Sequence, residues 1–197
     1  MLKISTDQIT ETGTVTELIS TATAKSYLRV DISDDDTKIG SMVTAARIYC
    51  ENFTGRSFAT HTYRADIPNF HDEMVLPGRP IQSISSVQYY NTASPEALTA
   101  VAANVYQLAQ SSVVRRYGMT WPTSWAIRPD ACQITYTSGY LDNASPQVAW
   151  LPEPVEHAQL LIIGDLYENR EQQFVGFQQV QPNRTVDMLL NAYRVYQ

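Results

Sequence analysis

The acidic run between Asp31 and Asp36 is the first stretch whose residue types could bind a metal ion. A calcium-binding EF-hand loop that began at Asp31 would need glycine at its sixth position and glutamate at its twelfth. Those positions hold Asp36 and Met42, so the run does not fit such a loop. Because carboxylates are stabilised by the dipole at the start of a helix, we interpret the run as a helix N-terminus.

The three histidines and two cysteines lack the spacing of a metal or catalytic site. His61, His71 and His157 are far apart, and Cys50 and Cys132 form no CxxC or Cys/His pair. The sequence also has no nucleophile elbow, no HExxH, no Walker loop and no GxGxxG. We therefore predict no catalytic residues, no metal site and no cofactor, in a protein that is not an enzyme.

Two tryptophans lie close together in Trp121-Pro122-Thr123-Ser124-Trp125. Exposed rings beside proline could bind a sugar or a peptide, which would make the surrounding segment a ligand-binding β module. Alternatively, the rings plug one end of a β domain. We favour the second interpretation because such rings bury large areas.

Composition narrows the class of protein further. The 197 residues carry a net charge of −6 and only 17% charged residues, which excludes a generic basic nucleic-acid binder. The N-terminal ten residues contain no apolar stretch of a secretion signal, and the longest aliphatic run, residues 160–163, is too short to span a membrane. We expect a protein of a reducing compartment with no membrane partner.

Helical signals occupy the first part of the chain, after a polar arm of sixteen residues that we expect to be loose. Ser20 is a candidate N-cap for a short helix over about 21–29. A longer helix is predicted to open at the acidic run and to end at Gly55, because its apolar residues follow three- and four-residue spacing.

The middle of the chain alternates polar and apolar residues, with prolines between the alternating runs. Short connections between short strands indicate an antiparallel sheet or a small barrel. The predicted strands cover residues 59–67, 84–90, 105–109, 112–117 and 132–137.

Helical spacing returns in the last part, with one helix over 155–170 and a terminal helix over about 185–196. We predict an α+β fold in which a small helical bundle, built from both chain ends, carries an inserted antiparallel β domain. The expected segments are 1–56 for the arm and first helices, 57–145 for the β domain, and 146–197 for the last bundle helix and a C-terminal tail.

Short pieces of sequence between residues 20 and 171 form an ordered set. They are Ala24-Lys25, Leu28-Arg29-Val30-Asp31, Ala45-Ala46-Arg47, Thr54-Gly55-Arg56, Leu76-Pro77, Ile84-Ser85-Ser86-Val87, Trp121-Pro122, Ile134-Thr135-Tyr136-Thr137 and Tyr167-Glu168-Asn169-Arg170-Glu171. The set resembles the head–tail connector family of long-tailed phages and gene transfer agents, also called adaptor or head-completion proteins.

The resemblance implies a structural protein of the virion neck, assembled in the host cytoplasm. In this family, copies form a dodecameric ring under the portal, which extends the DNA channel and connects the head to the stopper or tail. The implied partners are the portal protein, stopper or tail components, further copies of the chain, and double-stranded DNA that passes through without specific binding. A stopper or tail terminator is the alternative role within the virion.

Two sets of residues are candidates for these contacts. Opposite charges beside an apolar helix face, as in Tyr167-Glu168-Asn169-Arg170-Glu171, suit pairing between subunits and also suit a simple C-terminal cap of the helix. The intersubunit candidates are Arg47, Arg56, Tyr167, Glu168, Arg170 and Glu171.

The stretch 172–183 has too few apolar residues to build a core, yet it spaces hydrophobic anchors, which is typical of a segment that orders on a partner. The portal-binding candidates are Phe174, Phe177, Arg184, Met188, Leu189, Tyr193 and Tyr196. The alternative is that the terminal helix packs back on its own bundle.

Overall fold

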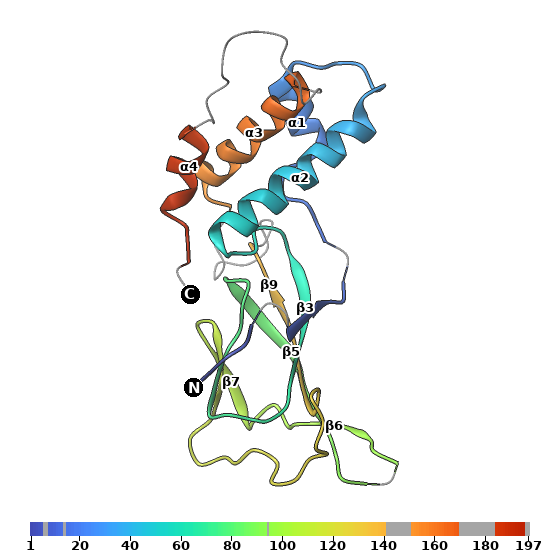
Figure 1. Ribbon diagram of the computed structural model, residues 1–197, viewed down its shortest axis with the longest axis vertical. Helices are drawn as coiled ribbons and strands as arrows, with labels where there is room; N and C mark the ends of the chain where they lie inside the picture. The colour runs from blue at the N-terminus through green and yellow to red at the C-terminus, as the bar shows by residue number, and fades with distance from the viewer. Residues whose placement is uncertain (6–7, 14, 94, 141–150, 170–183, 196–197) are drawn as a thin grey trace. The chain divides into compact units, whose positions relative to one another are not determined.

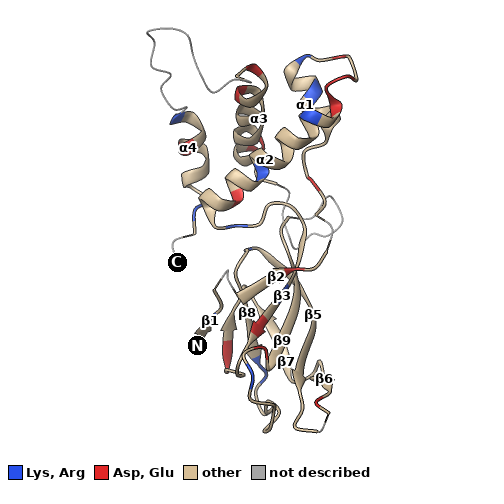
Figure 2. Ribbon diagram, turned by 45° about the vertical axis from the view of Figure 1, so that its right-hand side comes forward, with Lys and Arg blue, Asp and Glu red and all other residues tan. Residues whose placement is uncertain are grey.

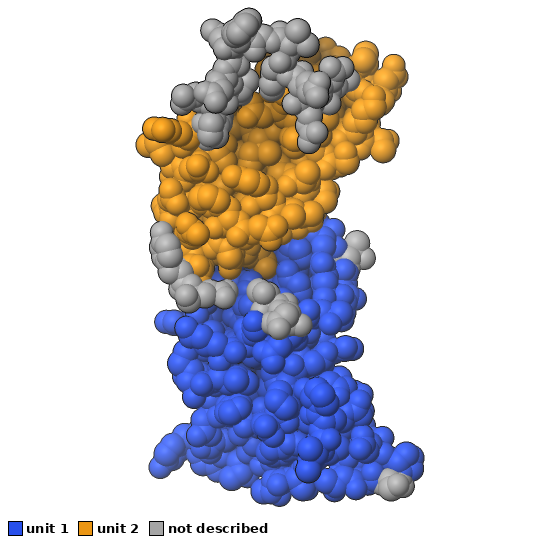
Figure 3. All heavy atoms as spheres, viewed as in Figure 1, with its two compact units in different colours: residues 1–16, 59–140 blue, residues 17–58, 141–197 orange. Residues whose placement is uncertain are grey.

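The computed structural model describes residues 1–5, 8–13, 15–93, 95–140, 151–169 and 184–195. The chain forms two compact units (Figure 3). The β unit comprises residues 1–16 and 59–140, and the helical unit comprises residues 17–58 and 141–197. The β unit is therefore built from the N-terminal segment together with a long insertion between helices.

Four helices form the described part of the helical unit (Figure 1). Their local signals were readable in the sequence: the Thr23 N–H donates to the Ser20 side chain at 3.0 Å, and Gly55 ends the second helix with a φ of 69°. The helices are α1 (Thr21–Leu28), α2 (Asp36–Thr54), α3 (Glu153–Glu168) and α4 (Arg184–Asn191).

The core of the helical unit lies where α2 packs against α1 and α3. Ile39, Val43 and Ala46 recur at helical spacing along one side of α2 and are almost completely buried. Acidic residues gather in the connection between α1 and α2 (Figure 2). Asp36 pairs there with Lys25 of α1 at 2.6 Å, so the acidic run begins α2 as expected.

Two sheets make up the β unit, with strand orders β1-β4-β8-β7 and β2-β3-β9-β5-β6. All pairings are antiparallel except that of β1 with β4. The strands are β1 (Leu2–Lys3), β2 (Ile9–Glu11), β3 (His61–Ile67), β4 (Glu73–Val75), β5 (Ile81–Tyr90), β6 (Leu98–Ala100), β7 (Tyr106–Ala109), β8 (Ser112–Arg115) and β9 (Cys132–Ser138).

One hydrophobic core serves both sheets. Tyr136 of β9 lies at its centre, fully buried, and its hydroxyl donates to the Pro77 carbonyl at 3.2 Å. Burial raises the pKa of Tyr136 well above its usual range. Met74 and Val113 reach the same core from the other sheet.

The α+β class, with helices at both chain ends, is confirmed. Two expectations are corrected. The first sixteen residues are not a loose arm, because β1 pairs with β4 and β2 pairs with β3. The strands also form two sheets rather than one, because the unpredicted strands β1 and β4 join β7 and β8 in a sheet of their own.

Candidate interaction surfaces

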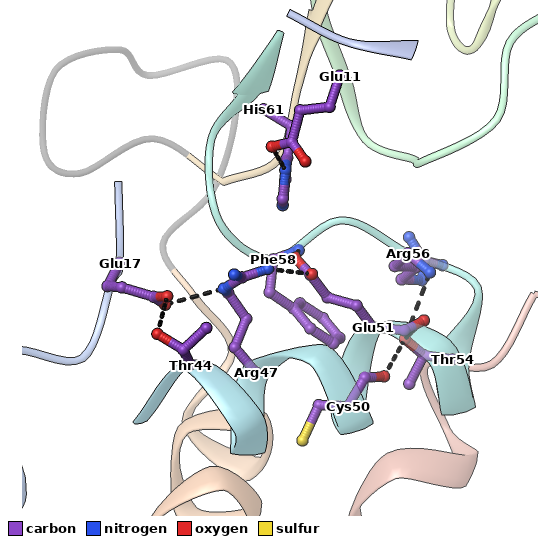
Figure 4. Close-up of polar contacts among 10 residues, drawn as sticks. All are labelled: Glu11, Glu17, Thr44, Arg47, Cys50, Glu51, Thr54, Arg56, Phe58 and His61. Carbon is purple, nitrogen blue, oxygen red and sulfur yellow. Dashed lines mark hydrogen bonds and ion pairs between the residues drawn. The ribbon is translucent and has the colours of Figure 1, made fainter. Parts of the chain in front are cut away.

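A buried ionic cluster organises one side of α2 (Figure 4). Arg47 is only 7% exposed, and its guanidinium donates to Glu17 at 2.9 Å and to Glu51 at 2.6 Å. Thr44 also donates to Glu17, at 2.9 Å. Burial by itself would lower the pKa of Arg47, but the two carboxylates outweigh it and the pKa is raised, so the cluster keeps its charges.

The cluster contacts both ends of the first segment of the helical unit, residues 17–58. Glu17 begins the unit, and Phe58 ends its first segment. The Phe58 N–H donates to Glu51 at 2.7 Å, so both ends of the segment are tied to α2. Arg47 was predicted from the sequence to contact a neighbouring subunit. Its guanidinium is instead buried and ion-paired within its own chain.

The C-terminal helix packs on its own unit. Val186 and Leu190 of α4 are buried against neighbouring helices, whereas Met188 is 76% exposed. Arg56 donates to the Tyr193 carbonyl at 2.6 Å, which ties the residues after α4 to the end of α2. The apolar face of α4 therefore packs on its own helical bundle, which is the second of the two possibilities given for the terminal helix.

The other predicted contact residues fall into three groups. The Tyr167 hydroxyl donates to Asp35 at 3.2 Å, which links α3 to the start of α2. Arg184, Met188 and Glu168 are exposed, while Leu189 and Tyr193 are half-buried. Five candidates lie outside the described residues: Arg170, Glu171, Phe174, Phe177 and Tyr196.

An open groove between α2 and α3 was missed by the sequence analysis. It has a volume of about 440 Å³. Its two walls lie more than a hundred residues apart in the chain, so no local pattern could have revealed it. The lining residues are Lys38, Ser41, Met42, Ala45, Leu166 and Asn169.

The two tryptophans pack on the core of the β unit. Trp121 stacks on Phe70 with ring centroids 4.7 Å apart, and Trp125 meets the edge of the same ring at 5.5 Å. Their indole N–H groups donate to the His71 carbonyl and the Asn69 side chain. The plug interpretation is confirmed, since both ring contacts and both donors are used within the unit.

Titratable and nucleophilic residues are held in structural roles. Burial raises the pKa of both Cys50 and Cys132 to about 12, so neither is a thiolate at neutral pH. His61 pairs with Glu11 at 2.8 Å and stacks on Tyr63. Within the described ranges, no three histidine, cysteine or acidic residues are grouped to hold a metal ion, and no helix is long and apolar enough to cross a membrane.

The comparisons with solved structures find the same fold. A chain from the neck of an empty GTA (gene transfer agent) particle, computed with C6 symmetry, matches with a TM-score of 0.72 at 19% identity, over 96% of each chain. A chain from the virion of a native GTA particle gives 0.71 at 19%, again over 96% of each chain. A chain from a native GTA neck with C12 symmetry gives 0.65 at 17%, over 94% of this chain and 97% of that one.

The search of curated proteins gave no match. The scan against family models did, with the family described as "Head completion protein" and residues 17–192 matched. That range includes all four helices and most of the β unit. On this match, the chain belongs to the head completion protein family.

Proposed function

We propose that this protein is a head–tail adaptor of the virion neck, which forms a ring under the portal, extends the DNA channel and connects the head to the stopper or tail. The observation that carries the proposal is the family match over residues 17–192. Support comes from the fold shared with chains of GTA necks along 94% or more of both chains, in particles computed with cyclic symmetry.

The role is structural and needs surfaces rather than a reactive centre. The cysteine thiols have raised pKa values, and the tryptophan rings and their N–H groups are used in packing. The net charge of −6 also suits a DNA channel, because an acidic surface does not retain the phosphate backbone as DNA passes.

The portal contact is assigned to the C-terminal part of the chain. Met188, 76% exposed on α4, offers a flexible apolar side chain, and Arg184 lies on the same side four residues earlier. Phe174, Phe177 and Tyr196 add apolar anchors in sequence on either side of α4. Leu189 and Tyr193 complete the proposed set.

Contacts between copies in the ring are assigned to the charged ends of helices. Glu168 is exposed at the end of α3, next to Tyr167 and followed by Arg170 and Glu171. Arg56 follows α2 and holds the Tyr193 carbonyl. Arg47 is left out of this surface because its guanidinium is buried with Glu17 and Glu51.

The test is to mix the purified chain with its portal and to image the complex by electron microscopy. We expect a ring of this chain directly on the portal. A chain that binds only below an adaptor ring already in place would instead be a stopper or a tail terminator.

The portal contact is tested by Met188→Asp, with Tyr117→Asp of the β unit as the matched control, because both side chains are largely exposed. We expect Met188→Asp to weaken portal binding by about tenfold or more, equivalent to about 1.4 kcal/mol, and the control to bind normally. Normal capping of the portal by Met188→Asp would overturn the assignment of Met188.

A further inference from the structure

The outward face of α2 carries unusually little charge. Between Ile39 and Cys50 the only charged residue is Arg47, which is turned inward and ion-paired. The exposed side of this stretch instead presents Ile48 at 45% and Tyr49 at 47% exposure. The exposed face of a surface helix normally carries charged and polar residues. This face of α2 is therefore more apolar than a face that contacts only solvent.

The groove between α2 and α3 continues this face. Met42 and Ala45 line it from α2, and Leu166, 38% exposed, lines it from α3. Ser41 and Ala45 are small residues four positions apart, which allows another helix to approach closely. Together with Ile48 and Tyr49 they make an apolar strip over about two and a half turns of α2, which the groove deepens at one end.

The charge of the strip favours one occupant over others. Each copy of the chain has a net charge of −6, so two copies repel unless they meet through faces that lack negative charge. None of the described residues that line the groove is acidic, and the one cation among them, Lys38, is paired with Asp35 at 3.0 Å. An acidic lining would favour a basic partner. A neutral lining adds no repulsion toward a second acidic copy of this chain, so it favours that copy.

We propose that the groove and the adjoining face of α2 (Ser41, Met42, Ala45, Ile48, Tyr49 and Leu166, here called the α2 strip) receive the neighbouring copy of this chain in the ring. The inference rests on the proposed ring function. A ring contact joins two different surfaces of the same protein, so the strip is one half of it. Asn169, the residue that follows Glu168 at the end of α3, lines the groove, so the strip reaches the charged helix end proposed above for this contact.

The experiment places a photo-reactive p-benzoylphenylalanine at Ala45 in the full chain assembled on its portal. Ala22, an exposed alanine on α1 of the same unit, is the matched control position. We expect irradiation of the Ala45 variant to give a covalent dimer of this chain, at twice its mass, and the Ala22 variant to give at least about tenfold less. A cross-link from Ala45 to the portal, or only within its own chain, would overturn the inference.

A second variant guards against an Ala45 probe that itself blocks assembly. Ile48→Asp adds a charge to the strip at an exposed position, and Ser26→Asp adds the same charge to the exposed side of α1. We expect Ile48→Asp to remain folded by circular dichroism but to reduce the fraction of chain in rings by about tenfold or more, with Ser26→Asp unaffected. Full ring formation by Ile48→Asp would contradict the proposal.

The two proposals fail in different ways. If the wild-type chain forms no ring on the portal, the adaptor function is wrong. If it forms rings in which Ala45 does not cross-link to another copy, the function stands and only the assignment of the α2 strip is wrong.

Discussion

The two units of this protein differ in what they leave exposed. The β unit packs most of its aromatic side chains against one core, whereas Tyr117 and Ile127, its most exposed large apolar residues, lie in the connection between β8 and β9. The helical unit exposes Ile48, Tyr49 and Met188 on the faces of regular helices. The difference lies in where the exposed apolar side chains are held, because regular helices present them on a continuous surface that is available to a partner.

The units also differ in how their interiors are held together. Backbone segments approach closely in the β unit, where Gly139 leaves no room for a side chain beside Ala59. In the helical unit, a buried arginine and two carboxylates tie the chain to α2. Substitutions should therefore affect each unit by a different physical route.

The largest effect is expected from Gly139→Ala. Gly139 has a φ of +106°, and an added Cβ would lie 1.9 Å from the Ala59 carbonyl oxygen, so backbone would have to move. We expect a loss of stability above about 4 kcal/mol, measured by urea unfolding. Gly118→Ala is the matched control: its φ is +76° with no atom within 4 Å, so only about 1 kcal/mol is expected. Equal losses for the two variants would contradict the close approach.

Arg47→Met should be the next most damaging change, and it acts on the helical unit. Removing the guanidinium leaves Glu17 and Glu51 without their shared cation in a largely buried site, which costs about 3–5 kcal/mol. Lys38→Met removes the ion pair between Lys38 of the same helix, 64% exposed, and Asp35 just before it, and should change the free energy of unfolding by less than about 1 kcal/mol. Thermal unfolding followed at the helical signal compares the two, and a small effect of Arg47→Met would show that solvent reaches the cluster.

Leu190→Ala and Met188→Ala separate stability from assembly on one helix. Leu190 is fully buried, so its truncation to alanine should lower the free energy of unfolding by about 2–5 kcal/mol. Met188 is 76% exposed, so its truncation should change that free energy very little. Chemical denaturation measures both. Deleting the whole C-terminal segment would mix the two effects, because the deletion removes buried Leu190 together with exposed Met188. A large destabilisation by Met188→Ala would mean that this side chain packs within the fold.

The elements that could be predicted from sequence are those with strong local signals. The Ser20 cap, the spaced apolar residues of α2 and the Gly55 stop all lie within a few residues of the structure they determine. The short strands β1, β2, β4 and β6 were missed because two or three residues are too few to show the polar–apolar alternation that predicts a strand. Their pairing partners, such as Met74 for Leu2, lie far away in sequence.

The same distinction applies to the interaction surfaces. The i,i+4 pairing of Arg47 with Glu51 is a local signal, but nothing near Arg47 in sequence predicts its pairing with Glu17, thirty residues earlier, which completes its burial within the chain. The α2 strip needs α3 as its second wall, and α3 follows the whole β insertion. Met188 remains a predicted portal contact, and its side chain is exposed because its neighbours Val186 and Leu190 take the buried side of α4.

The smallest effect is expected at the surface of the β unit, from Asp130→Asn. Arg128 donates to both Asp130 oxygens, at 2.6 and 2.9 Å, and these bonds hold the pKa of Asp130 below its usual value of 3.8. A lowered pKa in the folded state adds stability that is present above pH 4 and is lost as the pH falls through the folded-state pKa. The wild type should therefore be slightly more stable than the variant at neutral pH, with the difference vanishing in acid.

Because Asp130 is about one-third exposed, salt should also reduce this difference. Unfolding midpoints of the two proteins at pH 7 and pH 2, each at low and high salt, provide the measurement. Asp72→Asn, which removes a 78% exposed partner of Arg115, serves as the control and should shift the midpoint less at pH 7. If the difference caused by Asp130→Asn persisted unchanged at pH 2, it would come from packing rather than charge. The β unit would then depend on fitted contacts at its surface as well as in its core, which would deepen its contrast with the helical unit.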